Sequence, residues 1–284
     1  MYNFPIGAMN HSFRLPYNEV LKKAQELGIN GIQFAAIGEN SYVNLDAAKR
    51  RELVKMTKDA GLTFSAICAD DGRGFWRPEI IPACIESAKR ALDLAKDLEC
   101  NIATTHIGVV PADKNHERYK IMQEACAELA RYADSVDAHF AIETGPETSA
   151  VLKEFLDSLG SKGVAVNLDP ANLVMVTGDD PVQAVYNLKD YIVHTHAKDG
   201  KMLVKGDPEQ IYGIIKRPED VAAIKNFIEV PLGEGSVDFP AYIRALEDIG
   251  YRGFLTIERE VGENPVADIG TAVNFLKNII VEDK

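Results

Sequence analysis

The sequence predicts a closed (β/α)8 barrel, in which eight parallel strands alternate with helices. Eight short apolar segments alternate with segments whose apolar residues recur at helical spacing, and such alternation is typical of parallel sheets. The length of 284 residues suits one barrel, and no shift in composition marks a second domain. Polar and apolar side chains alternate within the later strands, as expected where one strand face packs on helices and the other enters a barrel. We therefore expect one domain over residues 1–284.

The first half of the chain contains four of the expected strands. Gly28 and Gly61 each follow a helical segment and are good helix stops, and Asp46 precedes one as a good N-cap. The spacing predicts strands over residues 1–8, 31–36, 62–69 and 102–106, and helices over residues 17–27, 46–60, 78–98 and 113–135.

The second half repeats the pattern with one long interruption. Strands are expected over residues 140–143, 164–168, 191–193 and 253–258, and helices from Thr148 or Ser149 to Gly160 and over residues 181–188, 237–249 and 264–280. Residues 198–236 are charged and rich in glycine and proline. A long connection inside a compact domain is often functional, so we expect an extended loop after the seventh strand.

Composition excludes several classes of protein. The net charge of −12 argues against nucleic acid or an anionic membrane as the main partner, because phosphate backbones are bound by clustered lysine and arginine. We find no secretory leader pattern and no apolar run approaching the roughly 18 residues of a membrane span. The four cysteines form no CxxC pair, so we expect reduced thiols and a cytoplasmic location.

Strands five to eight each end in a side chain that can ligate a metal ion. These side chains are Glu143, Asp169, His196 and Glu258. The four strands are neighbours in a closed barrel, so their ends should meet at one arc of the rim. Three carboxylates and one imidazole suit a divalent ion: Mn²⁺ is favoured, with Mg²⁺, Co²⁺ and Zn²⁺ as alternatives. The alternative for any one carboxylate is a salt bridge.

Five motifs resemble the sugar phosphate isomerase/epimerase family, the xylose isomerase-like TIM barrels that include ketose 3-epimerases and inosose-processing enzymes. They are AIETG at 141–145, NLDPAN at 167–172, HTHAKDG at 194–200, PLGEGSVDF at 231–239 and TIERE at 256–260. The resemblance implies the same four metal ligands, a carbohydrate substrate and a homodimer or higher homo-oligomer. Ketose epimerases commonly have a histidine three residues after the aspartate ligand. Here that position is Asn172, a candidate substrate contact.

The reaction implied by the resemblance is proton abstraction beside a carbonyl. A divalent metal bound to a sugar carbonyl and the adjacent hydroxyl makes the neighbouring C–H more acidic. One of Glu143 and Glu258 would then remove the proton, and the other would return it from the opposite face. The alternative for either glutamate is metal ligation alone.

Five further residues are candidates for substrate binding. His106 ends the fourth strand and is expected to bind a substrate oxygen or to anchor its loop. Glu147 either binds a substrate hydroxyl or supplies negative charge at a helix N-terminus. His194 shares the inward face with the metal ligands, as a substrate contact or as a core histidine. Lys198 lies at the mouth, where it could hold a hydroxyl, carboxylate or phosphate, or pair with Asp199 or Glu260. Trp76 is either an aromatic wall for the sugar or a packing residue.

The same site is compatible with other activities. The first alternative is a lyase, either a dehydratase or an enzyme that cleaves 3-keto-glycosides, since these reactions also begin beside a carbonyl. An endonuclease for abasic DNA would need more ligands and a basic groove, and the acidic balance argues against it. A sugar-binding barrel without catalysis would not require all four ligands.

Overall fold

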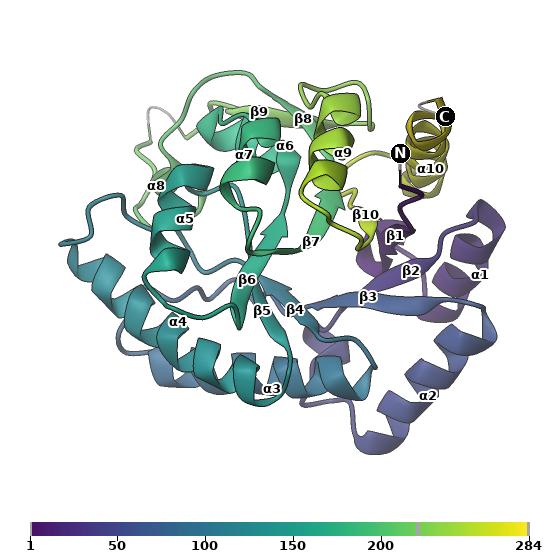
Figure 1. The fold of residues 1–284 in the computed structure, drawn as a ribbon, viewed down its shortest axis with the longest axis horizontal. Helices are drawn as coiled ribbons and strands as arrows, with labels where there is room; N and C mark the ends of the chain where they lie inside the picture. The colour runs from purple at the N-terminus through teal and green to yellow at the C-terminus, as the bar shows by residue number, and fades with distance from the viewer. Residues whose placement is uncertain (1, 220–221, 283–284) are drawn as a thin grey trace.

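The predicted barrel is confirmed by the computed structural model, which describes residues 2–219 and 222–282. The chain closes eight parallel strands into a barrel with the order β1-β10-β7-β6-β5-β4-β3-β2 (Figure 1). The strands are β1 (Ile6–Met9), β2 (Gly31–Ala35), β3 (Thr63–Cys68), β4 (Ile102–Thr105), β5 (His139–Glu143), β6 (Val164–Leu168), β7 (Ile192–Ala197) and β10 (Leu255–Ile257). Thus β5, β6, β7 and β10 are consecutive neighbours.

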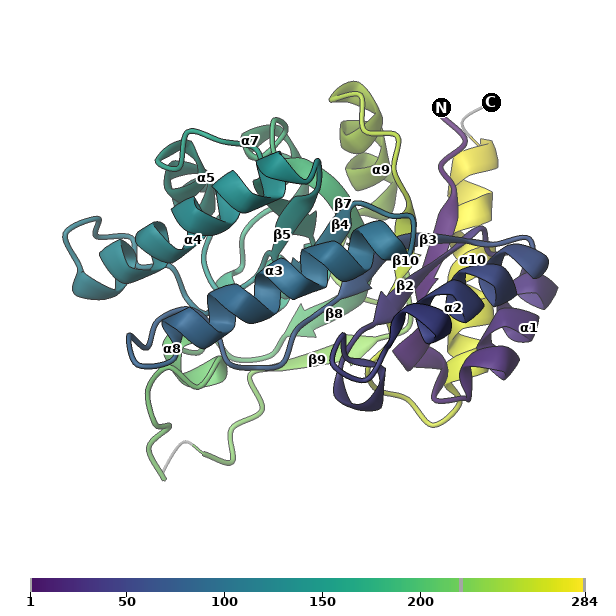
Figure 2. The ribbon, with the colours of Figure 1, turned by 90° about the horizontal axis from the view of Figure 1, so that it is seen from below.

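Helices surround the strands, and their caps explain where they begin (Figures 1 and 2). Asp46 caps its helix by accepting from the N–H groups of Ala48 and Lys49. His116 caps another by accepting from Arg118 N–H, so that helix begins four residues later than the expected residue 113. The principal helices are α1 (Tyr17–Leu27), α2 (Ala47–Asp59), α3 (Ile81–Asp97), α4 (Glu117–Ser135), α5 (Ser149–Asp157), α7 (Pro181–Asn187), α9 (Phe239–Asp248) and α10 (Pro265–Glu282). None of the described helices is long and apolar enough to cross a bilayer.

The two faces of the barrel strands have different chemistry, as their alternation predicts. Phe140 and Ile142 of β5 belong to the hydrophobic core, and the other strands contribute apolar residues in the same way. Polar groups lie between them on the barrel side. His194 is an example: its Nδ1 lies 2.8 Å from Oδ1 of Asn167, and its Nε2 lies 2.9 Å from Oγ1 of Thr256. The barrel interior below the site is therefore a hydrogen-bonded polar network.

The connection after β7 is extended, as predicted, but it has secondary structure of its own. It forms an antiparallel hairpin of β8 (Asp199–Met202) and β9 (Phe227–Val230), with the short helix α8 (Pro208–Ile211) between them. Figure 2 shows this insertion on the side of the barrel away from the two termini. The Asp199 carboxylate holds the segment after β9 by accepting from the N–H groups of Gly233 and Gly235, at 3.0 and 2.9 Å. A Cβ on Gly235 would lie 1.8 Å from that carboxylate, so the close approach requires glycine.

Candidate metal centre

The four strand-end side chains that the sequence singles out lie together at the carboxyl ends of β5, β6, β7 and β10. One ligand atom from each of them lies within 4.8 Å of the others, in a cluster of Glu143, Asp169, His196 and Glu258. Nδ1 of His196 is 3.6 Å from Glu143 Oε1, 3.3 Å from Asp169 Oδ2 and 3.2 Å from Glu258 Oε2. The imidazole nitrogen thus faces all three carboxylates.

The two carboxylate oxygens of Asp169 have different partners: one caps a helix and the other faces the cluster. It follows β6 and caps the short helix α6 (Pro170–Asn172): Oδ1 accepts from the N–H groups of Ala171 and Asn172, at 2.8 and 3.0 Å. The Thr144 hydroxyl holds the Asp169 backbone by accepting from its N–H at 2.8 Å and donating to its carbonyl at 3.0 Å. These contacts leave Oδ2 directed at His196, as a ligand oxygen would be.

Gln33 holds the His196 ring in its orientation. The His196 Nε2–H donates to Oε1 of Gln33 at 2.9 Å, and Gln33 Nε2 in turn donates to the Thr104 hydroxyl at 2.9 Å. Nδ1 then faces the carboxylates, and it is the nitrogen that would bind a metal ion. Gln33 is not among the residues predicted from the sequence. Its signal is a polar residue inside the apolar segment GIQFA of β2.

Two amides position Glu143. Asn167 Nδ2 donates to Glu143 Oε2 at 3.2 Å, and Asn172 Nδ2 donates to Glu143 Oε1 at 3.0 Å. Asn172 also contributes to the wall of the pocket above the cluster. The residue three positions after Asp169 therefore orients one of the two candidate acid/base groups.

The charges around the cluster fit a divalent cation. Lys198 is the neighbouring ammonium group: its Nζ lies 2.9 Å from Oε2 of buried Glu258, 4.0 Å from Oδ2 of buried Asp169 and 2.5 Å from Oε2 of exposed Glu260. Burial alone would raise the pKa of Glu258, but Lys198 and His196 hold it well below its usual range. Ionised carboxylates beside one imidazole are the donor set that borderline-hard divalent ions prefer.

A cavity of about 610 Å³ opens above the cluster. Its wall includes five of the predicted site residues, namely His106, Glu143, Asn172, Lys198 and Glu258. Asp169 and His196 lie fully buried beneath it. Tyr212, which was not predicted from the sequence, follows α8 and places its ring 5.5 Å from that of His106. The insertion after β7 therefore forms part of the wall.

His106 faces the cluster with one nitrogen and is held by the other. Its Nδ1 lies 2.7 Å from Asp70 Oδ2, a partner that the sequence analysis missed. Its Nε2 lies 3.8 Å from Glu143 Oε1 and has no hydrogen-bond partner among the described residues. Burial alone would lower the pKa of His106, but Glu143 and Asp70 raise it to about 9. A protonated imidazole beside the pocket can donate to a substrate oxygen.

Three predicted substrate contacts lie outside the pocket wall. Both nitrogens of His194 are hydrogen-bonded beneath the cluster, a position that fits a core histidine. Glu147 is buried, with Oε2 accepting from Val110 N–H at 3.0 Å. The Trp76 ring packs against the loops after β3 and β4, where side chains on Gly74 and Gly108 would collide with it. This position fits a packing residue, and direct substrate contact by these three stays a prediction.

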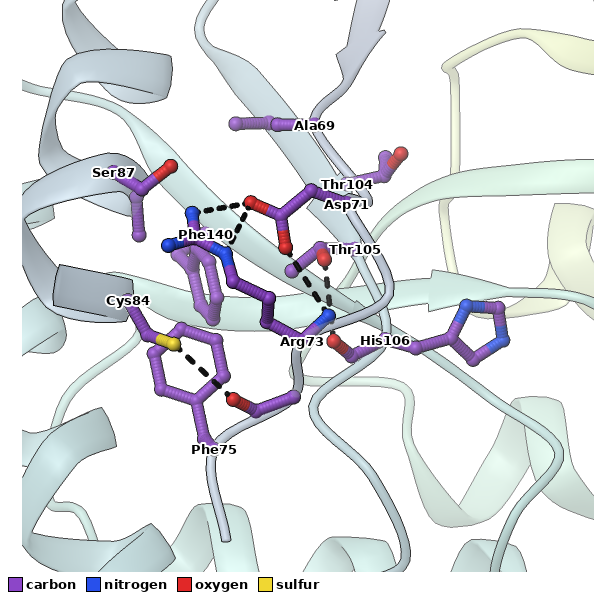
Figure 3. Close-up of a pocket in the computed structure, with 13 residues that line it drawn as sticks. Ala69, Asp71, Arg73, Phe75, Cys84, Ser87, Thr104, Thr105, His106 and Phe140 are labelled. Carbon is purple, nitrogen blue, oxygen red and sulfur yellow. Dashed lines mark hydrogen bonds and ion pairs between the residues drawn. The ribbon is translucent and has the colours of Figure 1, made fainter. Parts of the chain in front are cut away.

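A much smaller cavity, of about 20 Å³, lies behind His106 (Figure 3). Its lining includes the Arg73–Asp71 ion pair and the Cys84 thiol, which donates to the Gly74 carbonyl at 3.4 Å. It is too small for a sugar, so the larger pocket is the candidate substrate site.

The fold and the site define the protein as a TIM barrel with a candidate metal centre at the carboxyl ends of its strands. Comparison with known proteins gives the family. Residues 21–279 match the xylose isomerase-like TIM barrel family, and the chain belongs to it. A crystal structure described as a xylose isomerase domain protein from Planctomyces limnophilus superposes with a TM-score of 0.78. It is 24% identical in sequence and covers 97% of this chain and 96% of that one, which shows the fold alone.

Two curated relatives carry different activities in their names. An inosose dehydratase from Lacticaseibacillus casei is 25% identical over 122 residues, or 43% of this chain and 39% of the relative. SgbU of Escherichia coli K12, provisionally named an L-ribulose-5-phosphate 3-epimerase, is 25% identical over 248 residues, or 84% of this chain and 81% of the relative. The match thus spans about two fifths of the dehydratase and most of SgbU.

Proposed function

We propose that this protein is a divalent-metal-dependent isomerase or epimerase of a sugar or sugar derivative. The observation that carries the proposal is the position of two carboxylates. Glu143 at the end of β5 and Glu258 after β10 both reach the pocket wall, and both lie within 4 Å of the same imidazole nitrogen. Two carboxylates in one polar pocket can act as a base and an acid on one substrate.

The chain's own side chains supply the proton transfers. A divalent ion, proposed as Mn²⁺ and held by Glu143, Asp169, His196 and Glu258, would supply Lewis acidity toward a substrate carbonyl. One of the two glutamates removes the proton from the carbon beside the carbonyl, and the other returns a proton to the opposite face. The Asn172 amide keeps a Glu143 oxygen oriented in the pocket wall.

Three groups in the pocket wall would hold the sugar. Protonated His106 is positioned to donate from Nε2 to a substrate oxygen next to Glu143. Lys198 is positioned to donate to a hydroxyl from the side of Glu258. Asn172 contributes an amide to the same wall. A sugar bound in this way would bring its reacting carbon close to the two glutamates.

A dehydratase is the second candidate, and Lys198 is the observation that favours it. Elimination of water requires a proton donor for the leaving hydroxyl in addition to a base beside the carbonyl. The Lys198 ammonium group is buried at the pocket wall, next to Glu258. The inosose dehydratase among the relatives agrees with this alternative.

Solvent-deuterium exchange distinguishes the two reactions. The protein would be incubated in D₂O with free ketoses, keto-inositols, 3-keto-glycosides and phosphosugars, with Mn²⁺ and then with a chelator. We expect metal-dependent deuterium incorporation, detected by mass spectrometry as a gain in mass of the sugar. The sugar should lose neither water nor an aglycone. Loss of water or of an aglycone would establish the lyase instead. Absence of exchange across the panel by the Mn²⁺-loaded protein would overturn the proposal.

A further inference from the structure

We propose that the pocket takes an uncharged sugar or polyol and rejects phosphate esters, because carboxylates of this chain occupy the part of the rim where a phosphate group would bind. The inference rests on the proposed function for its substrate class. It concerns the corner between β7 and β10, formed by Lys198, Glu229, Arg259 and Glu260. In parallel barrels, phosphate groups are frequently bound by the loops after the seventh and eighth strands, which here are β7 and β10.

Both cationic side chains at this corner already have carboxylate partners. Lys198 has 3% of its side chain exposed and pairs with Glu258 at 2.9 Å and with Glu260 at 2.5 Å. Arg259 pairs with Glu229 at 2.5 Å through Nη1 and with Asp268 at 2.8 Å through Nε. A phosphate would therefore have to compete with two carboxylates for each of these cations.

Two backbone donors at the corner are occupied as well. The Glu260 N–H points at the Glu229 carboxylate, 3.2 and 3.3 Å from its two oxygens. The Arg259 N–H donates to the Ser12 hydroxyl at 3.0 Å. Glu229 therefore receives a guanidinium group and a backbone N–H, which is a donor set that proteins use for phosphate.

Glu229 belongs to the insertion and is fixed in place. It lies on β9, its side chain is 5% exposed, and it lines the pocket. The hairpin register pairs Glu229 with Gly200 on β8, and Gly200 comes two residues after Lys198, which follows the end of β7. The insertion thus places a carboxylate of the protein itself, that of Glu229, at the corner.

The pocket wall as a whole contains five carboxylates. Its carboxylates are Asp70, Glu143, Glu229, Glu258 and Glu260. His106 is paired with Asp70, and the remaining basic side chains of the wall, His11 and Lys225, are exposed to solvent. A phosphate dianion would face like charges here, whereas sugar hydroxyls can donate to the same carboxylates.

The first test compares matched substrates. Deuterium exchange would be measured for D-fructose against D-fructose 6-phosphate and for D-ribulose against D-ribulose 5-phosphate, with Mn²⁺ present. We expect the uncharged member of a pair to exchange at least tenfold faster. Equal or faster exchange of a phosphate ester would overturn the inference.

The second test is independent of turnover and uses inorganic phosphate as the probe. Isothermal titration calorimetry would compare the wild-type protein with Glu229→Gln, which frees Arg259 from a charged partner. We expect at least tenfold tighter phosphate binding in the variant. Repeating the titration on chelator-treated protein separates binding at Arg259 from coordination by the metal, and the gain should persist there.

Two controls accompany the phosphate titration, one for net charge and one for folding. Glu263→Gln removes the same charge from an exposed side chain in the loop after β10 and should leave phosphate affinity unchanged. Thermal unfolding verifies that each variant is folded, and Glu229→Ala provides a second variant. Submillimolar phosphate binding by the wild type, or unchanged affinity in both folded Glu229 variants, would overturn the inference. If no sugar exchanges at all, the proposed function fails, but the phosphate titration still decides this question.

Discussion

The ammonium nitrogen of Lys198 lies 2.9 Å from Oε2 of Glu258, so a candidate metal ligand is also one half of a buried ion pair. The same ammonium group is 4.0 Å from Asp169. A divalent cation in the cluster would therefore share its carboxylates with a fixed positive charge. Coulombic interactions over such distances are strong when they are shielded from water.

Replacing Lys198 should separate metal binding from turnover. In Lys198→Met the competing charge is removed while the apolar stem is kept, so we expect Mn²⁺ affinity to rise about tenfold, which corresponds to ~1.4 kcal/mol. Deuterium exchange should fall about 100-fold or more, because the sugar loses a donor that positions it beside the two glutamates. Calorimetric titration with Mn²⁺ measures the first effect. Lys201→Met, at an exposed position on β8, controls for net charge. Weaker Mn²⁺ binding by Lys198→Met would contradict this interpretation.

The two candidate acid/base groups should each be indispensable. Glu143→Gln and Glu258→Gln preserve shape and remove the basic oxygen, so we expect each to lower the exchange rate by at least about 10²- to 10⁴-fold. The fold should survive, as judged by circular dichroism and thermal unfolding. A variant that retained its metal and near-wild-type exchange would show that its glutamate is not an acid/base group.

The sequence was sufficient to predict the barrel because the information is local. Each strand and helix is marked by its own periodicity, and caps such as Asp46 and Gly28 mark their ends. The arc of four strand ends also follows from topology alone, because consecutive parallel strands of a barrel are neighbours. The sequence alone therefore predicts that Glu143 and Glu258 lie close together.

The residues that support the site could not be predicted in this way. Gln33 reaches His196 across the barrel from a strand 163 positions away in sequence. Asp70 reaches His106 from the loop after β3, and Tyr212 depends on how the insertion folds. These contacts depend on the closure of the barrel and on irregular backbone, neither of which leaves a periodic signal.

Gln33 should matter for metal binding although it lies behind the ligand. Gln33→Met keeps the length of the side chain and removes the acceptor for the His196 Nε2–H. We expect the affinity for Mn²⁺ to fall about 10- to 100-fold, as is typical when a partner of a ligating histidine is lost. Gln183→Met, on the outer helix α7, is the matched control. Equal Mn²⁺ dissociation constants for Gln33→Met and the wild type would show that the orientation of the imidazole does not depend on this amide.

Tyr212 should contribute to substrate recognition from the insertion. Its ring lies against His106, and a Cβ at Gly145 would approach its hydroxyl to 2.8 Å, so the hydroxyl lies beside the loop after β5. We expect Tyr212→Phe to raise KM about tenfold, with a smaller change in kcat, if the hydroxyl binds substrate. Tyr186→Phe, which removes a hydroxyl bonded to Asp248 on the outer surface, should have no effect. Unchanged kinetics in Tyr212→Phe would assign the residue a packing role.

Glu147 should make the stability of the protein depend on pH. Burial raises its pKa from the ordinary 4.5 to about 8, although Val110 N–H and His106 act in the opposite direction. Between these two values the folded protein holds a proton that the unfolded chain releases. The contribution of Glu147 to the free energy of unfolding is therefore fully present below about pH 4.5 and is lost as the pH rises through about 8.

Glu147→Gln should remove that dependence, because its neutral amide resembles the protonated acid and can still accept from Val110 N–H. We expect similar unfolding free energies for variant and wild type near pH 5. Near pH 9 the variant should be more stable by at least ~1 kcal/mol, since one pKa unit corresponds to about 1.4 kcal/mol. Urea unfolding of chelator-treated protein across this range measures the difference. Glu154→Gln, an exposed substitution on α5, controls for charge. A constant difference between Glu147→Gln and wild type at all pH values would mean that the buried carboxyl does not titrate in this window.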